Sequence, residues 1–148
     1  MNQLNKKAYF MLPGFWEHFS LYKIMNEFLE KYPEAKREEA EIYCYYGNFS
    51  PCTWDGGRTF SSYHPADLES IQEVINYYNK VLNKKIRFVF TNNILEKQHC
   101  FDHYNNIILN LSKNFKNEIV LNSPILEEYL NENFPEFELI SSTTKCLY

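Results

Sequence analysis

The stretch LESIQEVINYYNKVLNKKIRFVFTNN, residues 68–93, shows the pattern that decides the fold. Its first part carries apolar residues at helical spacing, which predicts an amphipathic helix. These residues are Leu68, Ile71, Ile75, Tyr78 and Leu82. Its second part, Ile86–Phe90, is a short apolar run that stops at Thr91-Asn92-Asn93, typical of a buried strand that ends in a turn. A helix that leads directly into a buried strand is typical of a repeating α/β unit.

The same alternation recurs along the whole chain. Four further short apolar runs predict strands at Ala8–Leu12, Ile42–Tyr46, Glu118–Leu121 and Phe137–Ile140. Helical patterns separate the runs, from Phe15 to Lys31, from Phe101 to Phe115, and in a short helix after the predicted N-cap Ser123. Strands that alternate with helices predict a parallel sheet, and right-handed crossovers bring the carboxyl ends of all strands to one edge.

Two architectures fit this pattern. One is a partial TIM-type (β/α) barrel of about five strands, and the other is an open doubly wound sheet. A doubly wound nucleotide binder usually has a glycine-rich turn after its first strand, where this chain has only Pro13-Gly14. A complete barrel has more strands than these five. We therefore expect residues 1–148 to form a single α/β domain, a truncated or half barrel.

Composition narrows the classes of partner. The net charge of the 148 residues is −4 and the basic residues are scattered, so we expect no nucleic-acid partner. No apolar run reaches the about 18 residues that cross a bilayer, and no signal peptide is recognisable, so we expect no membrane partner and a cytoplasmic protein. The four cysteines have no C-x-x-C spacing and are expected to be reduced thiols.

Five segments in order resemble a known family: YFMLPGF, IYCYYGNF, IRFVFTNN, IVLNSPILEEYL and ELISSTTK. They are similar to the front half of the collagenase-like peptidase family, and more closely to an uncharacterised bacterial group with YFxLPG, WxGGR, NSPxLExY and SSTTK motifs. The resemblance covers nearly all of this chain but only about half of such proteins, and it implies a (β/α) barrel. In that family the residues thought to hold an iron–sulfur cluster lie beyond the fifth strand, so the resemblance carries neither metal binding nor peptidase activity to this chain.

The sharpest local motif is Trp54-Asp55-Gly56-Gly57-Arg58, in the loop after the second strand. Gly56 and Gly57 would let the backbone approach a ligand, and Arg58 would bind a carboxylate or phosphate. Trp54 offers a stacking face, and Asp55 is the candidate acid or base. The alternative is a tight glycine turn in which Arg58 pairs with Asp55.

Polar side chains also follow the later strands. Asn48, Asn92 and Asn122 stand at equivalent strand ends, where carboxamides can orient a polar substrate or simply form turns. We assign Asn92 and Asn122 to substrate binding. Ser142 and Lys145, after the fifth strand, would contact the far end of the ligand, and a desolvated Lys145 could form a Schiff base. The alternative is a solvated terminus with a surface lysine.

His99 and His103 have a spacing that can chelate zinc on a helix. No third ligand accompanies them at a diagnostic distance, and the core stripe of their helix faces away from them. The sequence therefore predicts no metal site and no cofactor.

These patterns predict a protein that binds a small polar or anionic metabolite at the carboxyl edge of its strands. If it is an enzyme, which the sequence leaves open, Asp55 and Lys145 are the catalytic candidates. The rest of the barrel would come from a homo-oligomer, a second chain or a longer parent protein. The alternative is a non-catalytic interaction module, or a truncated remnant, that pairs through an open edge strand.

Overall fold

A computed structural model describes residues 7–57, 65–113, 115–143 and 145. The strands are β1 (Ala8–Pro13), β2 (Ala40–Gly47), β3 (Lys85–Phe90), β4 (Glu118–Leu121) and β5 (Glu138–Ser141). The α-helices are α1 (Phe19–Lys31), α2 (Leu68–Asn76), α3 (His103–Ser112) and α4 (Pro124–Asn133). Short 3₁₀ segments occupy Pro33–Ala35 and Lys97–Phe101, and a π-helical turn, Tyr77–Val81, extends α2.

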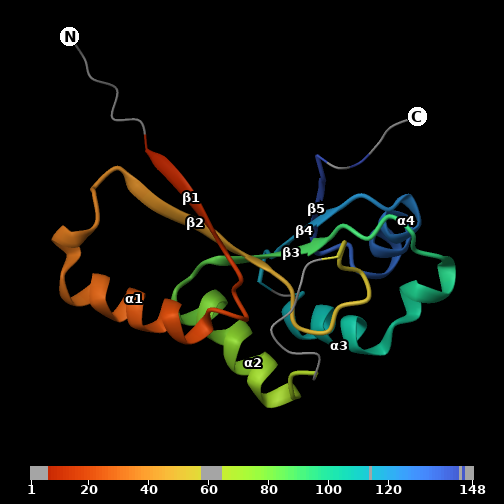
Figure 1. Cartoon of the computed structure of the whole chain (residues 1–148), viewed down its shortest axis with the longest axis horizontal. Coiled ribbons are helices and arrows are strands. Elements are labelled where there is room, and N and C mark those ends of the chain that lie inside the picture. Colours follow the sequence, from red (N-terminus) through yellow and green to blue (C-terminus); the bar gives the residue numbers. More distant parts are fainter. Residues whose placement is uncertain (1–6, 58–64, 114, 144, 146–148) are drawn as a thin grey trace, which may run out of the picture.

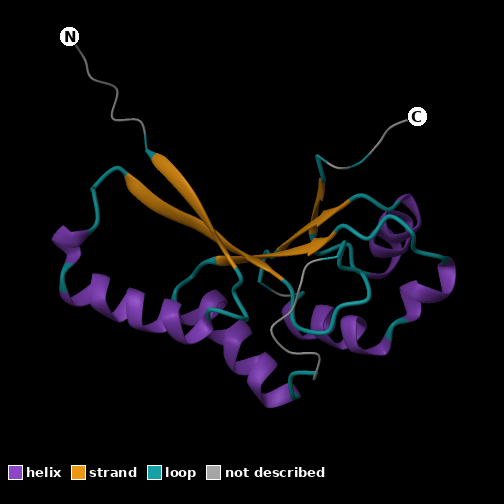
Figure 2. Cartoon of the chain, in the orientation of Figure 1, coloured by secondary structure: helices purple, strands orange, loops and turns teal. Residues whose placement is uncertain are grey.

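The strands form one sheet in the order β1-β2-β3-β4-β5, and every neighbouring pair is parallel. Each crossover therefore advances in the same direction, so right-handed connections place the helices on one face of the sheet. Figures 1 and 2 show this arrangement, with the strands as a curved layer above α1, α2 and α3. This is the order of a (β/α) barrel, whereas a doubly wound sheet reverses its order and carries helices on both faces.

The core lies between the sheet and the helices. Alternate strand residues point to it, including Tyr45, Phe88, Phe90, Ile119 and Leu121, all less than 3% exposed. The same cluster takes side chains from the helices. These are Tyr22 of α1, Ile71 and Ile75 of α2, Ile108 and Leu109 of α3, and Leu126 and Leu130 of α4. The intervening strand residues point away from all of the helices, and we call their side of the sheet the open face.

The predicted α/β alternation is confirmed, and its boundaries hold to within a few residues. Ser123 caps α4 as expected, by accepting a hydrogen bond from the backbone N–H of Leu126. Two expectations were wrong. Helix α1 begins at Phe19, and Phe15 lies fully buried in the turn that precedes it. Phe101, expected on the core face of a helix, lies in the 3₁₀ segment before α3 and is 73% exposed.

A buried carboxamide pair joins the bottom of α2 to the start of β4. Asn117 donates to Asn79 and to the carbonyl of Ser112, and its own oxygen accepts from Asn79 and from the backbone N–H of Ile86. These four bonds are 2.8–3.0 Å long. The pair therefore fixes where β3 begins relative to β4, although neither asparagine stands out in the sequence.

None of the helices in the described part of the chain is long and apolar enough to cross a membrane. Cys44, Cys52 and Cys100 are free thiols. Burial raises the pKa of the Cys44 thiol to about 11, which keeps it protonated and weakly nucleophilic at neutral pH.

Asn117→Ala should destabilise the protein by about 3 kcal/mol, because it leaves buried donors and acceptors without partners. Chemical denaturation would measure the loss. Asn110→Ala is the matched control, since that side chain is exposed and makes one bond to its own helix, and it should cost below about 0.5 kcal/mol. Equal effects of the two substitutions would contradict the role given to the carboxamide pair.

Candidate functional site

The loop after β2 contains the strongest motif of the sequence, but the protein covers its aromatic residue. Trp54 is fully buried, and its indole N–H donates to the carbonyl of His99 at 2.7 Å. Its ring packs edge-on against Phe90 and Tyr129, with centroids 5.0 and 6.5 Å away. Trp54 therefore anchors the loop to β3 and α4, and it does not present a free face to a ligand.

Asp55 and Asn48 form the base of the same loop. The Asn48 carboxamide donates to the Val89 carbonyl at 2.7 Å and accepts from the Val89 N–H at 3.0 Å. It thus pairs with the backbone of β3 as one more strand residue would. It also donates to the Asp55 carboxylate at 2.5 Å, and both side chains are buried. Asp55 is consequently part of a structural clamp on β3.

The two glycines have different roles. A Cβ on Gly56 would lie 2.6 Å from the Thr91 carbonyl oxygen and closer still to the Thr91 hydroxyl, so this position requires glycine for close packing. Gly57 has a φ of +95° and open space around it. Arg58, the expected anion-binding residue of the motif, lies outside the described residues, as does the pair it would make with Asp55.

The other predicted side chains at the strand ends hold the backbone of neighbouring segments. Asn92 donates to the carbonyl of Thr53 at 2.9 Å and accepts from the N–H of Ile94. Asn122 donates to the carbonyl of Thr91 at 2.8 Å. These contacts connect the turns at the carboxyl edge, so both carboxamides contribute to the shape of that edge.

The residues after β5 are also tied to the fold. Lys145 makes a 2.6 Å ion pair with Glu127 of α4, so its ammonium is bound to a carboxylate. The backbone N–H of Ser142 donates to the carbonyl of Leu121, and Ser142 is 9% exposed. Of the two expected catalytic residues, Asp55 bonds to Asn48 beside β3, and Lys145 pairs with Glu127 of α4.

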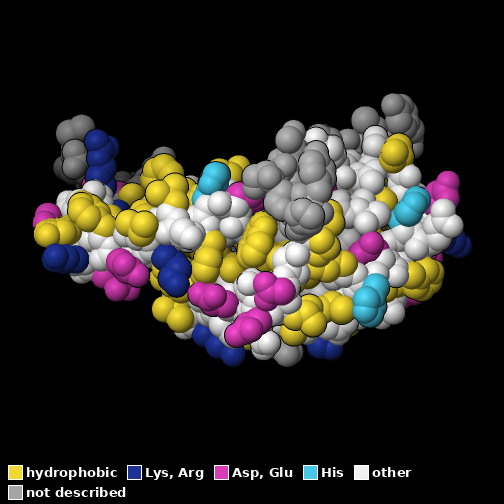
Figure 3. All heavy atoms as spheres, turned by 60° about the horizontal axis from the view of Figure 1, so that its bottom comes forward, with side chains coloured by type: hydrophobic (Ala, Val, Ile, Leu, Met, Phe, Trp, Pro, Cys, Tyr) yellow, Lys and Arg dark blue, Asp and Glu magenta, His cyan; other side chains and the backbone are white. Residues whose placement is uncertain are grey.

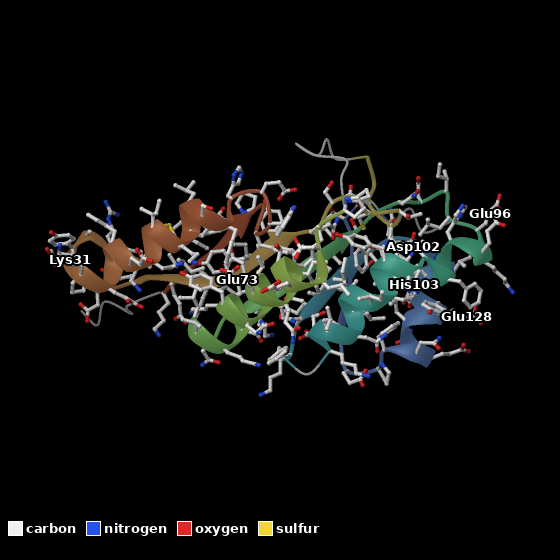
Figure 4. All side chains as sticks on the ribbon, turned by 90° about the horizontal axis from the view of Figure 1, so that it is seen from below. Lys31, Glu73, Glu96, Asp102, His103 and Glu128 are labelled. Carbon is white, nitrogen blue, oxygen red and sulfur yellow. The ribbon has the colours of Figure 1, made fainter. Side chains whose placement is uncertain are left out.

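The two spaced histidines lie on different elements. His99 belongs to the 3₁₀ segment, where its Nδ1 accepts from the N–H of Glu96, while His103 opens α3. Figure 4 labels His103 beside Asp102 on the helix side, and Asp102 caps α3 through the N–H of Asn105. Among the described residues no group of three or more His, Cys, Asp or Glu side chains could hold a metal ion.

A trough of about 600 Å³ lies on the open face of the sheet and runs to its carboxyl edge. Its walls include side chains from all five strands and from the turns after β3 and β5. The apolar lining includes Met11, Val89, Val120 and Ile140. The polar lining includes Arg87, Thr91, Ser142 and Thr143. Of the predicted site residues that the structure describes, only Ser142 lines this trough, which we call the open-face trough.

A charged cluster of Tyr43, Lys85, Arg87 and Glu118 adjoins the trough, and Arg87 is the member that lines it. The Glu118 side chain is 1% exposed, although it lies on the open face, because its three partners cover it. One carboxylate oxygen accepts from Lys85 at 2.6 Å and from the Tyr43 hydroxyl at 2.8 Å. The other accepts from Arg87 Nε at 2.7 Å and lies 2.6 Å from Nη2. The guanidinium also lies 5.5 Å from the centre of the Tyr43 ring.

The cluster stays ionised at neutral pH. Burial alone would raise the pKa of Glu118, but the hydrogen bonds from Lys85, Arg87 and Tyr43 outweigh it and lower that pKa. The hydrogen bond to Glu118 raises the pKa of Lys85. A carboxylate held in this way is a poor proton acceptor, so the cluster is suited to binding and orientation more than to acid–base catalysis.

The sequence carries signals for this cluster that the motif search did not use. Arg87 is one of three arginines, and it interrupts an otherwise apolar strand two positions after Lys85. That spacing places both cations on one face of the strand. Glu118 opens the next strand and pairs with Arg87 in the register of β3 and β4. A search for charges inside apolar runs would have found the three residues.

Comparison of the chain with known proteins finds no match among family models, curated proteins or solved structures.

We expect the free energy of unfolding to fall as the pH drops below about 5, in part through Glu118. Its pKa is lower in the folded chain than its ordinary 4.5, so the unfolded chain takes up the proton first. This contribution is complete above the ordinary pKa and is lost as the pH falls through the folded value. Denaturation at a series of pH values would measure it.

Glu118→Gln should flatten that acid limb and cost about 3 kcal/mol at pH 7, since Arg87 and Lys85 lose their shared carboxylate. Glu136→Gln removes the same charge from an exposed position and is the control. Superimposable pH profiles for the two variants would show that Glu118 makes no such contribution.

Proposed function

We propose that this chain is the front part of a (β/α) barrel protein that binds a small polar or anionic metabolite in the open-face trough. The observation that carries the proposal is the trough itself, which combines an apolar floor with a few converging polar groups. Such a combination is typical of small-molecule sites. In a (β/α) barrel the carboxyl edge of the strands is also where ligands bind.

The relation to the collagenase-like peptidases is part of the same proposal. The supporting evidence is the order of the quoted motifs together with the consecutive parallel strand order. On this proposal the protein is bacterial and cytoplasmic, and further strands complete the barrel wall. Those strands would come from a second copy, another chain or a longer parent protein.

Filling the trough should abolish ligand binding without unfolding the protein. Val120→Phe adds a ring at the middle of the apolar floor, on the face that none of the described helices covers. Small carboxylates, phosphates and sugars would be screened by ligand-detected and backbone-amide NMR. Any ligand found should bind the variant about tenfold more weakly or worse, a loss of about 1.4 kcal/mol.

Ile24→Phe is the matched control, because Ile24 is 65% exposed on α1, on the far side of the sheet. It should bind like the unchanged protein. A ligand that binds the Val120→Phe variant as tightly as the control would place the binding site elsewhere.

A second candidate function is that of a non-catalytic interaction module. Strand β1 is an edge of the described sheet, and its Tyr9, Phe10 and Met11 are 51–60% exposed. On α1, Leu21, Ile24 and Phe28 are also at least 51% exposed. Hydrophobic side chains reach the surface over α1, at the left of Figure 3. An apolar edge strand beside an apolar helix surface favours pairing with another chain.

Light scattering after size exclusion tests this second candidate. We expect the mass to rise with protein concentration, and Phe10→Lys to suppress the rise because it places a charge on the edge strand. Val81→Lys adds the same charge at a 69% exposed position away from β1 and should change nothing. A mass that stays constant for all three proteins would count against pairing through β1 in a second copy.

A further inference from the structure

We propose that the open-face trough takes a carboxylate monoanion with an apolar body, and that Arg87 anchors its carboxylate. The inference rests on the proposed function, since it names the chemical class of ligand for the same trough. It also moves the anion-binding role from Arg58, where the sequence motif placed it, to Arg87.

The first argument is the orientation of the guanidinium. Glu118 holds Nε and Nη2 on one side of Arg87, which fixes the plane of the group. On the other side Nη1 donates to the Met11 sulfur at 2.9 Å, and Met11 and Arg87 both line the trough. A thioether is a weak acceptor, so a carboxylate oxygen that replaces the sulfur would form a much stronger, charge-assisted hydrogen bond.

The second argument is charge. Lys85 and Arg87 together face the single buried carboxylate of Glu118, which leaves one positive charge beside the trough. Glu138 lies 3.8 Å from Lys85, but its side chain is 67% exposed, so water screens that contact. One added negative charge balances the cluster. A dianion such as a phosphate monoester would leave an uncompensated charge on an apolar floor.

The third argument is the lining beyond Arg87. Val89, Val120 and Ile140 are aligned across β3, β4 and β5 by the strand register, and they form a continuous apolar strip. Thr91 and Thr143 lie beyond this strip, toward the carboxyl edge, and Arg87 lies on its other side. Thr91 lies four positions after Arg87 along the chain, a span on the order of 13 Å. The trough therefore fits an extended apolar chain with the carboxylate at the Arg87 end.

Octanoate, octanol and octyl phosphate share one apolar chain and differ in the head group, which makes them suitable probes below their micelle-forming concentrations. We expect octanoate to bind the unchanged protein at least about tenfold more tightly than either of the others. In Arg87→Met the preference over octanol should vanish. Arg37→Met, at an exposed position, should keep it.

Arg87→Met also removes a partner of Glu118, so the variant changes the cluster as well as the trough. A second measurement therefore uses the unchanged protein. The chain has three arginines, so Arg37→Lys and Arg58→Lys suffice to assign the guanidinium NMR signals. Octanoate should shift the Arg87 signal most. A larger shift at Arg58, or none at any arginine, would overturn the inference.

Failure of the carboxylate inference and failure of the proposed function give different results. If octanol binds as tightly as octanoate and Val120→Phe blocks both, the trough is a ligand site but Arg87 is not its anion anchor. If none of the probes and no member of the metabolite screen binds, or if Val120→Phe has no effect on binding, the proposed function fails and the inference fails with it.

Discussion

Parallel pairing in strict chain order is the constraint on which the rest of this structure depends. Each strand adds to the same edge of the sheet, and each right-handed crossover returns its helix to the same face. The core is therefore one-sided, packed between Phe88, Ile119 and the helices. None of the described helices packs on the opposite face, so the side chains that point to it are available for a purpose other than packing.

The open face contains a buried ion pair, which is unexpected on a side of the sheet without a hydrophobic core. Glu118 is buried on this face, and Lys85, Arg87 and Tyr43 all bond its carboxylate. A buried ion pair of this kind contributes little net stability compared with apolar residues of the same size. The ion pair is better explained by its effect on Arg87, because it orients one edge of the guanidinium toward the open-face trough.

The sequence predicted the fold better than it predicted the site, and the physical reason is specific. Apolar periodicity reports burial against the helices, so β3 and β4 were located within one residue. Polar residues at strand ends can indicate either a ligand site or a turn, and apolar periodicity does not distinguish between the two. Asn92, Asn122 and Trp54 all bond the backbone of distant segments, which only the folded chain brings near. Arg87 was overlooked because it lies within a strand, whereas the candidate site residues were sought at the strand ends and in the loop after β2.

The Asn48 carboxamide allows the side chain at position 89 to vary, because it bonds only the backbone there. It binds the N–H and the carbonyl of Val89, groups that every residue except proline carries. At this contact the loop after β2 is held by the backbone of β3, while the Val89 side chain faces the trough. Substitutions at this position can reshape the ligand site and leave the loop anchored. New binding preferences could therefore arise here by single mutations, without a compensating change in the scaffold.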